Sequence, residues 1–409
     1  MPEANPRRHR AALPVIVVAQ LLGTSLWFSP SGAADGLMAH WSLDAAGFGW
    51  LVAATQLGFI AGTLIFAWTG VADRFSASRI FALCSVLGAL ANALVVAPGL
   101  GIAAAWGLRF AVGLCLAGIY PLGMKMVVHW VGARPASALA WLVGMLTLGT
   151  AMPHGLRAGN AAWPWEAVLL GASALALVGA AMVLRLGDGP FAPQVPAVVN
   201  GARLRNGLGG VMAVPGFRAS ALAYFGHMWE LYAFWAVLPW LCRPLAPVLT
   251  GPLGIGELSA TAWLSFAVIA SGTAGCVLGG VLSRRWGSAR VAGAALLGSG
   301  LMCLLYPLVP MTSSRWQLAA LFLWGFCVVA DSPQFSALSA GFAPPQCLGS
   351  ALVAQNGIGF GISVVSIVTL SHALPAWGHS ALWLLAPGPL FGLWALWPLL
   401  GRDMQGRAT

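Results

Sequence analysis

Long apolar runs alternate with short polar segments along almost the whole chain. We identify twelve runs close to the roughly 20 apolar residues that a membrane-spanning helix needs. They cover 12–34, 47–71, 79–98, 101–127, 136–156, 164–185, 217–241, 257–282, 290–310, 315–338, 349–371 and 379–400. The pattern predicts an all-α integral membrane protein with twelve transmembrane helices.

The longest polar interruption divides these runs into two groups of six. It extends from about residue 186 to residue 216, and its high Gly and Pro content is typical of a linker. We therefore expect an N-terminal six-helix bundle over 1–186, a cytoplasmic linker over 187–216 and a C-terminal six-helix bundle over 217–409.

Composition agrees with a protein that is surrounded by lipid. Hydrophobic residues make up 59% of the chain and charged residues only 7%, whereas soluble domains have roughly 25% charged residues. The seven cysteines are scattered singly with no C-x-x-C spacing, which argues against a disulfide framework or a zinc site. We expect no metal and no cofactor.

The basic residues predict how the chain lies in the membrane. With the N-terminus in the cytoplasm, 16 of the 20 Lys and Arg residues fall in inner segments, three fall outside and one, Arg109, lies within a span. Such an excess marks the cytoplasmic side. Both termini are then cytoplasmic, and we expect a monomer in a bacterial inner (plasma) membrane. No basic run resembles a nucleic-acid-binding surface.

The two halves of the chain repeat each other. The segment TGVADRFSASR, residues 69–79, aligns with GVLSRRWGSAR, residues 280–290, at an offset of 211. The segment GLCLAGIYP, residues 113–121, aligns with GFCVVADSP, residues 325–333, at an offset of 212. Repeats of this kind imply two bundles related by an axis along the membrane normal, with a substrate site between them. The prolines that end the second pair, Pro121 and Pro333, predict a disturbed helix in each half.

These segments resemble motifs of the major facilitator superfamily. The loop signature G-x-L-x-D-R-x-G-x-x-R is matched at Asp73, Arg74 and Arg79, although Thr69 and Ser76 replace glycines. The second copy keeps Gly280, Leu282, Arg285, Gly287 and Arg290, with Arg284 in place of the acid.

A third segment resembles a motif of the fourth helix that is associated with proton-linked members of that family. In RFAVGLCLA, residues 109–117, Arg109, Gly113 and Ala117 match the pattern R-x-x-Q-G-x-G-x-A, while Val112 and Cys115 depart from it.

The resemblance implies a fold, a mechanism and a role for the loops. Spans one, four, seven and ten would line a central cavity, and the protein would work by alternating access. The loop motifs would take part in gating and not in substrate binding, through Asp73, Arg74, Arg79, Arg284, Arg285 and Arg290. Their plainer interpretation is that arginines mark inner helix ends.

Four ionisable side chains fall near the middle of predicted spans: Arg109, His227, Glu230 and Asp331. Such groups are costly in a bilayer and usually mark a pathway. His227 and Glu230 are three residues apart and share one helix face. We interpret these four as the candidate substrate and proton pathway, and we expect Glu230 to face Arg109 and Asp331 across a cavity.

Further side chains are candidates for the same path: Tyr224, Gln334 and Asn356. Each ionisable group also has a structural interpretation. Glu230 could be a paired structural carboxylate, Asp331 could bond the backbone next to Pro333, and Arg109 could hold an anionic substrate or pair with an acid. At the outer end of the fifth span, His154 and Arg157 anchor the helix or form an entrance patch.

The sequence thus predicts a secondary active transporter, or permease, of a small organic solute that is coupled to protons through Glu230 or Asp331. One alternative is transport of an inorganic anion at Arg109, or of a soft metal at Met and His side chains. Another is a non-transporting receptor or scaffold. No nucleotide-binding motif or nucleophile–base arrangement appears, which disfavours ATP-driven transport and enzymatic activity.

Overall fold

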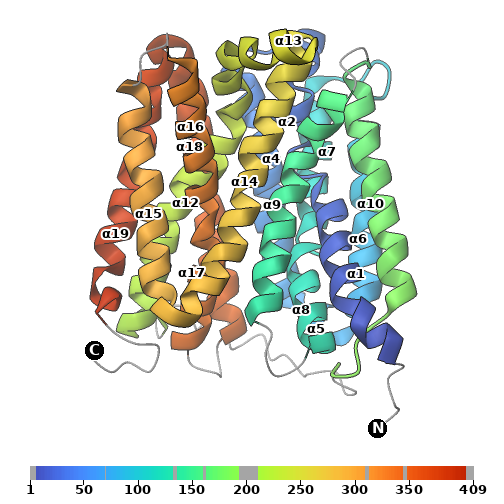
Figure 1. Ribbon diagram of the computed structural model, residues 1–409. Coiled ribbons are helices and arrows are strands. Elements are labelled where there is room, and N and C mark those ends of the chain that lie inside the picture. Colours follow the sequence, from blue (N-terminus) through green and yellow to red (C-terminus); the bar gives the residue numbers. More distant parts are fainter. Residues whose placement is uncertain are drawn as a thin grey trace.

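The computed structural model describes residues 6–69, 71–131, 136–159, 163–192, 211–308, 313–343 and 348–401. Every regular element in these ranges is a helix, so the predicted all-α class is confirmed. The long helices run side by side along one direction, and α1 begins on the side of the bundle where α19 ends (Figure 1).

The N-terminal half contains α1 to α10. Its elements are α1 (Pro6–Thr24), α2 (Ser29–Gly32), α3 (Ala34–Trp41), α4 (Ala45–Thr69), α5 (Val71–Arg74), α6 (Ala77–Leu94), α7 (Ile102–Leu116), α8 (Tyr120–Val131), α9 (Ala136–Gly159) and α10 (Glu166–Leu186).

The C-terminal half contains the remaining elements. They are α12 (Pro215–Cys242), η1 (Arg243–Leu245), α13 (Pro247–Leu253), α14 (Glu257–Trp286), α15 (Ser288–Leu305), η2 (Tyr306–Leu308), α16 (Ser314–Ala330), α17 (Ser332–Phe342), α18 (Leu348–Trp377), η3 (Gly378–Leu385) and α19 (Pro387–Leu400).

Several helical stretches are long and apolar enough to cross a bilayer. Within the described residues there are eight, or up to nine if a bent pair counts as one span. One of them, Ala351–Leu400, covers nearly all of the last two predicted runs, and η3 lies between α18 and α19. These lengths are consistent with the predicted twelve spans.

The predicted first, fourth and tenth spans are each interrupted. The breaks lie between α1 and α2, between α7 and α8, and at Asp331 between α16 and α17. Pro30, Pro121 and Pro333 each stand at the second residue of the helix that follows the break. Proline has no N–H to donate, so it fits the start of a helix, where that hydrogen bond would be missing anyway. The disturbance expected at Pro121 and Pro333 is therefore present.

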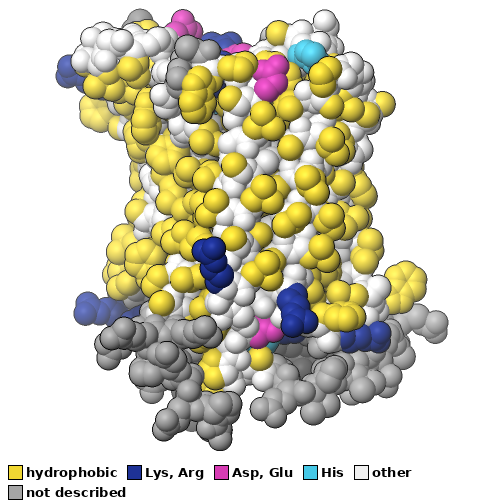
Figure 2. All heavy atoms as spheres, turned by 90° about the vertical axis from the view of Figure 1, so that its right-hand side faces the viewer, with side chains coloured by type: hydrophobic (Ala, Val, Ile, Leu, Met, Phe, Trp, Pro, Cys, Tyr) yellow, Lys and Arg dark blue, Asp and Glu magenta, His cyan; other side chains and the backbone are white. Residues whose placement is uncertain are grey.

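The outer surface suits lipid. Figure 2 shows a broad apolar belt over one face of the bundle, where the few charged side chains lie mostly toward the two ends. Large side chains are exposed there and on other faces, among them Trp68 at 80% and Trp397 at 75%. A surface of this kind would be a liability in water and is ordinary in a bilayer.

Two long helix pairs join the halves. α9 packs along α14, and α4 packs along α18. Thr273 on α14 donates a hydrogen bond of 3.0 Å to the carbonyl of Gly144 on α9. These two helix pairs therefore form two sides of the interface between the halves.

The predicted linker lies largely outside the described residues. Its first part, 187–192, is seen against the N-terminal half: Asp188 accepts a hydrogen bond of 2.8 Å from the N–H of Ser78 at the start of α6. The N–H of Phe191 donates to the carbonyl of His129. The division into domains at 186 and 217 stays a prediction.

Within the N-terminal half, α4 and α7 meet at glycines. A Cβ at Gly58 would collide with the carbonyl oxygen of Phe110, and a Cβ at Gly113 would collide with that of Thr55. We expect Gly113→Ala to lower the thermal midpoint of the purified protein in detergent, because overpacking of this kind costs about 1–3 kcal/mol. Gly107→Ala is the matched control on α7, since nothing lies within 4 Å of its added Cβ. Equal midpoints for the two variants would contradict the close approach.

Candidate functional site

Arg109 is fully buried and belongs to the N-terminal half. Its guanidinium has five N–H groups, and each of five contacts has an oxygen acceptor. These acceptors are Thr55 Oγ1 at 3.2 Å, Ser29 Oγ at 3.1 Å, Asn92 Oδ1 at 2.7 Å, the Leu26 carbonyl at 3.0 Å and the Trp27 carbonyl at 2.7 Å.

The Arg109 contacts have a clear structural consequence. Leu26 and Trp27 lie in the turn between α1 and α2, where carbonyls lack the partners that a continuous helix would supply. Arg109 on α7 supplies those partners. It also reaches α4 through Thr55 and α6 through Asn92, so one side chain ties four segments of the half together.

An aromatic layer fills the centre between the halves. The ring of Tyr232 on α12 stacks on Trp27 at 5.8 Å and on Phe28 at 6.0 Å between centroids. Phe360 on α18 packs against Trp27 at 5.6 Å and against Phe59 on α4 at 4.4 Å. All five rings are buried. The layer joins both halves through buried aromatic surface.

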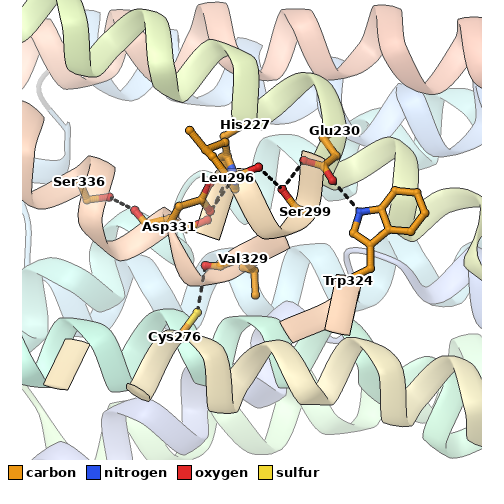
Figure 3. A network of polar contacts seen from close by, with 10 residues as sticks. His227, Glu230, Cys276, Leu296, Ser299, Trp324, Val329, Asp331 and Ser336 are labelled. Carbon is orange, nitrogen blue, oxygen red and sulfur yellow. Dashed lines mark hydrogen bonds and ion pairs between the residues drawn. The ribbon is translucent and has the colours of Figure 1, made fainter. Parts of the chain in front are cut away.

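His227 and Asp331 form a buried pair within the C-terminal half. His227 Nδ1 lies 2.9 Å from Asp331 Oδ1, and both side chains are only 1% exposed. The other ring nitrogen, Nε2, lies 2.9 Å from Ser332 Oγ. Figure 3 shows the imidazole of His227 beside Asp331. The pair therefore connects α12 to the break between α16 and α17.

The position of Asp331 explains how its carboxylate can be buried and still gain or lose a proton. It ends α16 and precedes α17, and the N–H groups of Asp331 and Ser332 lie close to its carboxylate. Neither of its carboxylate oxygens, nor Nδ1 of His227, makes a hydrogen bond of ordinary geometry to a described residue. This carboxylate can therefore take up a proton without losing a hydrogen bond of ordinary geometry.

Glu230 is held differently. Trp324 Nε1 donates to Oε1 at 2.6 Å, Cys303 Sγ donates to Oε1 at 3.2 Å, and Ser299 Oγ donates to Oε2 at 2.8 Å. The carboxyl therefore has a neutral donor on each oxygen, from α15 and α16 (Figure 3). Its three donors come from within the C-terminal half. The structure does not bring Glu230 and Arg109 together, because each is turned into its own half.

The other predicted path residues have fewer contacts with the ionisable groups described above. Tyr224 is half-buried, with its ring 6.0 Å from that of His227. Gln334 is 2% exposed, and its amide lies near Gly279 on α14. Asn356 is half-buried on α18. Of these three, Tyr224 is the one that the structure brings against the His227–Asp331 pair.

The predicted gating residues lie at the helix ends on the side where α1 begins. Arg74, Arg79, Arg284 and Arg285 are exposed. Arg290 is exposed too, and its Nε donates to the carbonyl of Leu400 at the end of α19 at 3.1 Å. The side chain of Asp73 lies outside the described residues. The gating role stays a prediction.

An ion pair joins the halves at the opposite end of the bundle. Arg243, after α12, contacts Asp35 on α3, and both side chains are about half exposed. Exposed pairs contribute about 0–1 kcal/mol. We therefore expect Arg243→Gln to raise the rate at which an aqueous thiol reagent labels a cysteine introduced at Thr261, by up to about five-fold. The exchanged pair Asp35→Arg with Arg243→Asp should restore the rate, and Arg315→Gln, at another exposed arginine, should leave it unchanged. A labelling rate unaffected by Arg243→Gln would show that the Asp35–Arg243 pair does not hold the two halves together at this end of the bundle.

The partners of Glu230 lie far from it along the chain and were not predicted from the sequence. Ser299, Cys303 and Trp324 lie 69, 73 and 94 residues away along the chain. The usable signal was the spacing of Ser299 and Cys303, which are four residues apart and share a face of an otherwise apolar helix. Among the described residues, no group of three or more His, Cys, Asp and Glu side chains is arranged to hold a metal.

Comparisons with known proteins agree with this architecture. The family model described as Major Facilitator Superfamily matches residues 16–367. The chain belongs to this superfamily. No curated protein matches it, whereas many solved structures do.

Three solved structures of similar fold illustrate the superfamily likeness. The nucleoside transporter NupG, in a mutant form, has a TM-score of 0.69 and 14% identity over 95% of this chain and 99% of its own. A second NupG structure has a TM-score of 0.67 and 13% identity, over 97% and 100%. An inward-facing, unoccupied bacterial homologue of the human lysosomal transporter Spinster has a TM-score of 0.66 and 15% identity, over 97% and 95%. By its match to the family model, the chain is a multi-pass membrane transporter of the superfamily.

Proposed function

We propose that this superfamily member is a proton-coupled transporter of a small organic solute, and that the His227–Asp331 pair carries the coupling proton. The observation that supports it most is the buried Asp331 carboxylate, whose Oδ1 lies 2.9 Å from the imidazole Nδ1 while neither of its oxygens makes a hydrogen bond of ordinary geometry. A group of this kind can gain or lose a proton without breaking a complete set of hydrogen bonds.

The imidazole is suited to the exchange. With Asp331 ionised, a protonated His227 forms an ion pair with the carboxylate through Nδ1, and the Ser332 hydroxyl accepts from Nε2. With His227 neutral, the hydroxyl donates to Nε2 instead, because a hydroxyl can reverse its role. Both states keep Nε2 satisfied. The charge on the pair changes while the neighbouring contact remains.

Glu230 has the structural role in this proposal. Its two oxygens already accept from Trp324, Cys303 and Ser299, so it links α12 to α15 and α16. A carboxyl held by three donors loses more on rearrangement than one with an open position. Of the two acids that the sequence singles out, the contacts favour Asp331 as the proton site.

The helix break gives the proton a mechanical consequence. Asp331 stands at the interruption between α16 and α17, and His227 on α12 is its partner. Neutralising the carboxylate weakens the link between α12 and α17. The halves can then repack around a bound solute, which is the two-state element that alternating access needs.

The other transport alternatives have weaker support. An inorganic anion at Arg109 would have to displace acceptors that already meet the five N–H groups. We place both chain ends in the cytoplasm, propose the bacterial inner membrane as the location, and expect a monomer. The likeness to NupG supports the inclusion of nucleosides among the solutes tested.

The test is a ligand-stability screen on the purified protein, followed by uptake of the stabilising solute into proteoliposomes. We expect accumulation above the outside concentration when an inward proton gradient is present, and simple equilibration when a protonophore removes it. Equal uptake in both conditions would contradict proton coupling.

A further inference from the structure

A groove runs between α15 and α19, which lie side by side at one edge of the bundle (Figure 1). It measures about 470 Å³. On each helix the lining positions share one face. They are Arg290, Gly293, Ala294 and Leu297 on α15, and Leu393, Trp394, Trp397 and Leu400 on α19. The groove therefore lies on the outer surface of the C-terminal half, and both of its sides come from that half.

The shape of the groove comes from small side chains set between large ones. Gly293 and Ala294 form its floor, and its walls are formed by Leu297, Trp394 and Trp397. These three wall residues are 52%, 69% and 75% exposed. Apolar side chains that are exposed on a membrane protein meet lipid, so the groove is open to the acyl chains of the bilayer.

The repeat does not reproduce this groove in the N-terminal half. At the offset of 211 residues that aligns the two loops, Arg290 corresponds to Arg79 on α6, and Ala294 corresponds to Leu83. Leu83 is 59% exposed. A large side chain thus stands in the N-terminal half where α15 has only a methyl group. The room in the groove is a feature of the C-terminal half, and the other half supplies matched control positions.

Positive charge gathers at one end of the groove. Arg290 lies near the start of α15, and its Nε donates to the carbonyl of Leu400, where α19 ends, at 3.1 Å. This bond holds the guanidinium across the gap between the two helices. Arg284 and Arg285 are exposed at the end of α14, immediately before α15. A planar guanidinium is well suited to phosphate oxygens.

The length of the groove suits the part of a phospholipid next to its headgroup. Arg290 and Leu297 are seven residues apart, which is about 10 Å along a helix. The hydrocarbon of one leaflet is about 15 Å thick. Trp397 lies three residues before the end of α19, and tryptophan favours the membrane–water interface. A phosphate at Arg290 would therefore place the upper part of an acyl chain along Trp397 and Trp394.

We propose that this groove binds an anionic phospholipid from the leaflet on the side where α1 begins. Its phosphate lies at Arg290, and one acyl chain lies between Leu297 and the two tryptophans. The arginines at this end attract a headgroup of net negative charge and repel the ammonium of a zwitterionic one. One basic residue near the surface favours an anionic lipid by about five-fold. The bound lipid bridges α15 and α19, and the site is independent of proton coupling.

The test is native mass spectrometry of the delipidated full-length protein, equilibrated in detergent with phosphatidylglycerol or with phosphatidylcholine of the same acyl chains. We expect one phosphatidylglycerol to bind at least about five-fold more tightly than phosphatidylcholine. Arg290→Gln should remove this preference. Ala294→Leu, which installs the side chain that the repeat has at this place, should weaken the binding of both lipids at least about three-fold, because it fills the apolar groove.

Two variants are matched controls. Arg79→Gln removes one exposed charge at the aligned position of the other half, and Ala174→Leu enlarges an exposed side chain on α10. Both should bind phosphatidylglycerol within about two-fold of the natural protein. Ala294→Leu changes an exposed position and leaves the bond between Arg290 and Leu400 in place. It therefore tests the groove even where Arg290→Gln unfolds early.

Several outcomes would overturn the assignment. Equal binding of the two lipids by the natural protein would remove the role of the charge. An equal loss in Arg290→Gln and Arg79→Gln would show only the general attraction of arginines for an anionic lipid. Unchanged binding by Ala294→Leu would place the lipid elsewhere. A dimer that Ala294→Leu dissociates would assign the groove to a second copy of the chain.

Discussion

Replacement of Asp331 by Asn is expected to abolish gradient-driven accumulation while solute exchange between the two sides of the membrane persists. Asn fills nearly the same volume and can still meet His227, but it cannot bind or release a proton in the physiological range. The variant should behave as if residue 331 were permanently protonated, because the Asn side chain is neutral like a protonated Asp. Counterflow, which needs only solute-bound rearrangement, should continue at a rate within about ten-fold of the natural protein.

The contrast with Glu230 makes this prediction specific. Glu230→Gln keeps an acceptor oxygen for Trp324 and leaves the His227–Asp331 contact untouched. We expect it to retain accumulation, with some loss of thermal stability, because the amide N–H₂ faces a group that also donates. Accumulation that is lost in Glu230→Gln and kept in Asp331→Asn would assign the proton to the other acid.

Replacement of Arg109 by Met is expected to have the largest effect on stability. The substitution removes the donors from Asn92, from Ser29 and from the two carbonyls of the turn between α1 and α2. Buried acceptors left without partners cost about 1–3 kcal/mol each, and relaxation recovers part of this cost. We expect a net loss of about 3–5 kcal/mol, a size typical of a broken buried charge network.

Conservative and exposed variants test whether Arg109 is structural. Arg109→Lys keeps the charge but supplies three donors in place of five, so its thermal midpoint should fall between those of the natural protein and Arg109→Met. Arg79→Met, at an exposed position, should change stability by less than about 0.5 kcal/mol. A Lys variant with the natural thermal midpoint and no solute binding would instead show that Arg109 holds substrate.

The fold was predictable because its signals are local. An apolar run predicts each span, and the matching loops and prolines show that the two halves repeat. Pro121 and Pro333 even mark where their helices are interrupted, since a proline at the second position of a helix needs no hydrogen bond from its nitrogen. The family likeness depended on the same local motifs.

The orientation of the site residues was not predictable in this way. α12 carries apolar side chains around its whole circumference, so no stripe indicates which face meets which neighbour. The depth of a residue along its span could be counted from the sequence, but the direction in which its side chain points could not. Glu230 was therefore expected opposite Arg109, whereas it lies against Trp324, Ser299 and Cys303 of its own half.

The His227–Asp331 contact falls between these two cases. Both residues were singled out by their cost in a membrane, and their spans were expected to line one cavity. That the imidazole meets Asp331 at 2.9 Å and Ser332 on its other side depends on the break that puts these residues at the start of α17. The sequence marks the break, and packing decides which side chain it faces.

The most direct test of the central claim is the number of protons exchanged when solute binds to the purified protein. Isothermal titration with the stabilising solute, repeated in buffers of different ionisation enthalpy, measures that number without a membrane. We predict proton exchange in the natural protein and in Glu230→Gln, and none in Asp331→Asn. Exchange that persists unchanged in Asp331→Asn, or that is absent from the natural protein, would contradict the account.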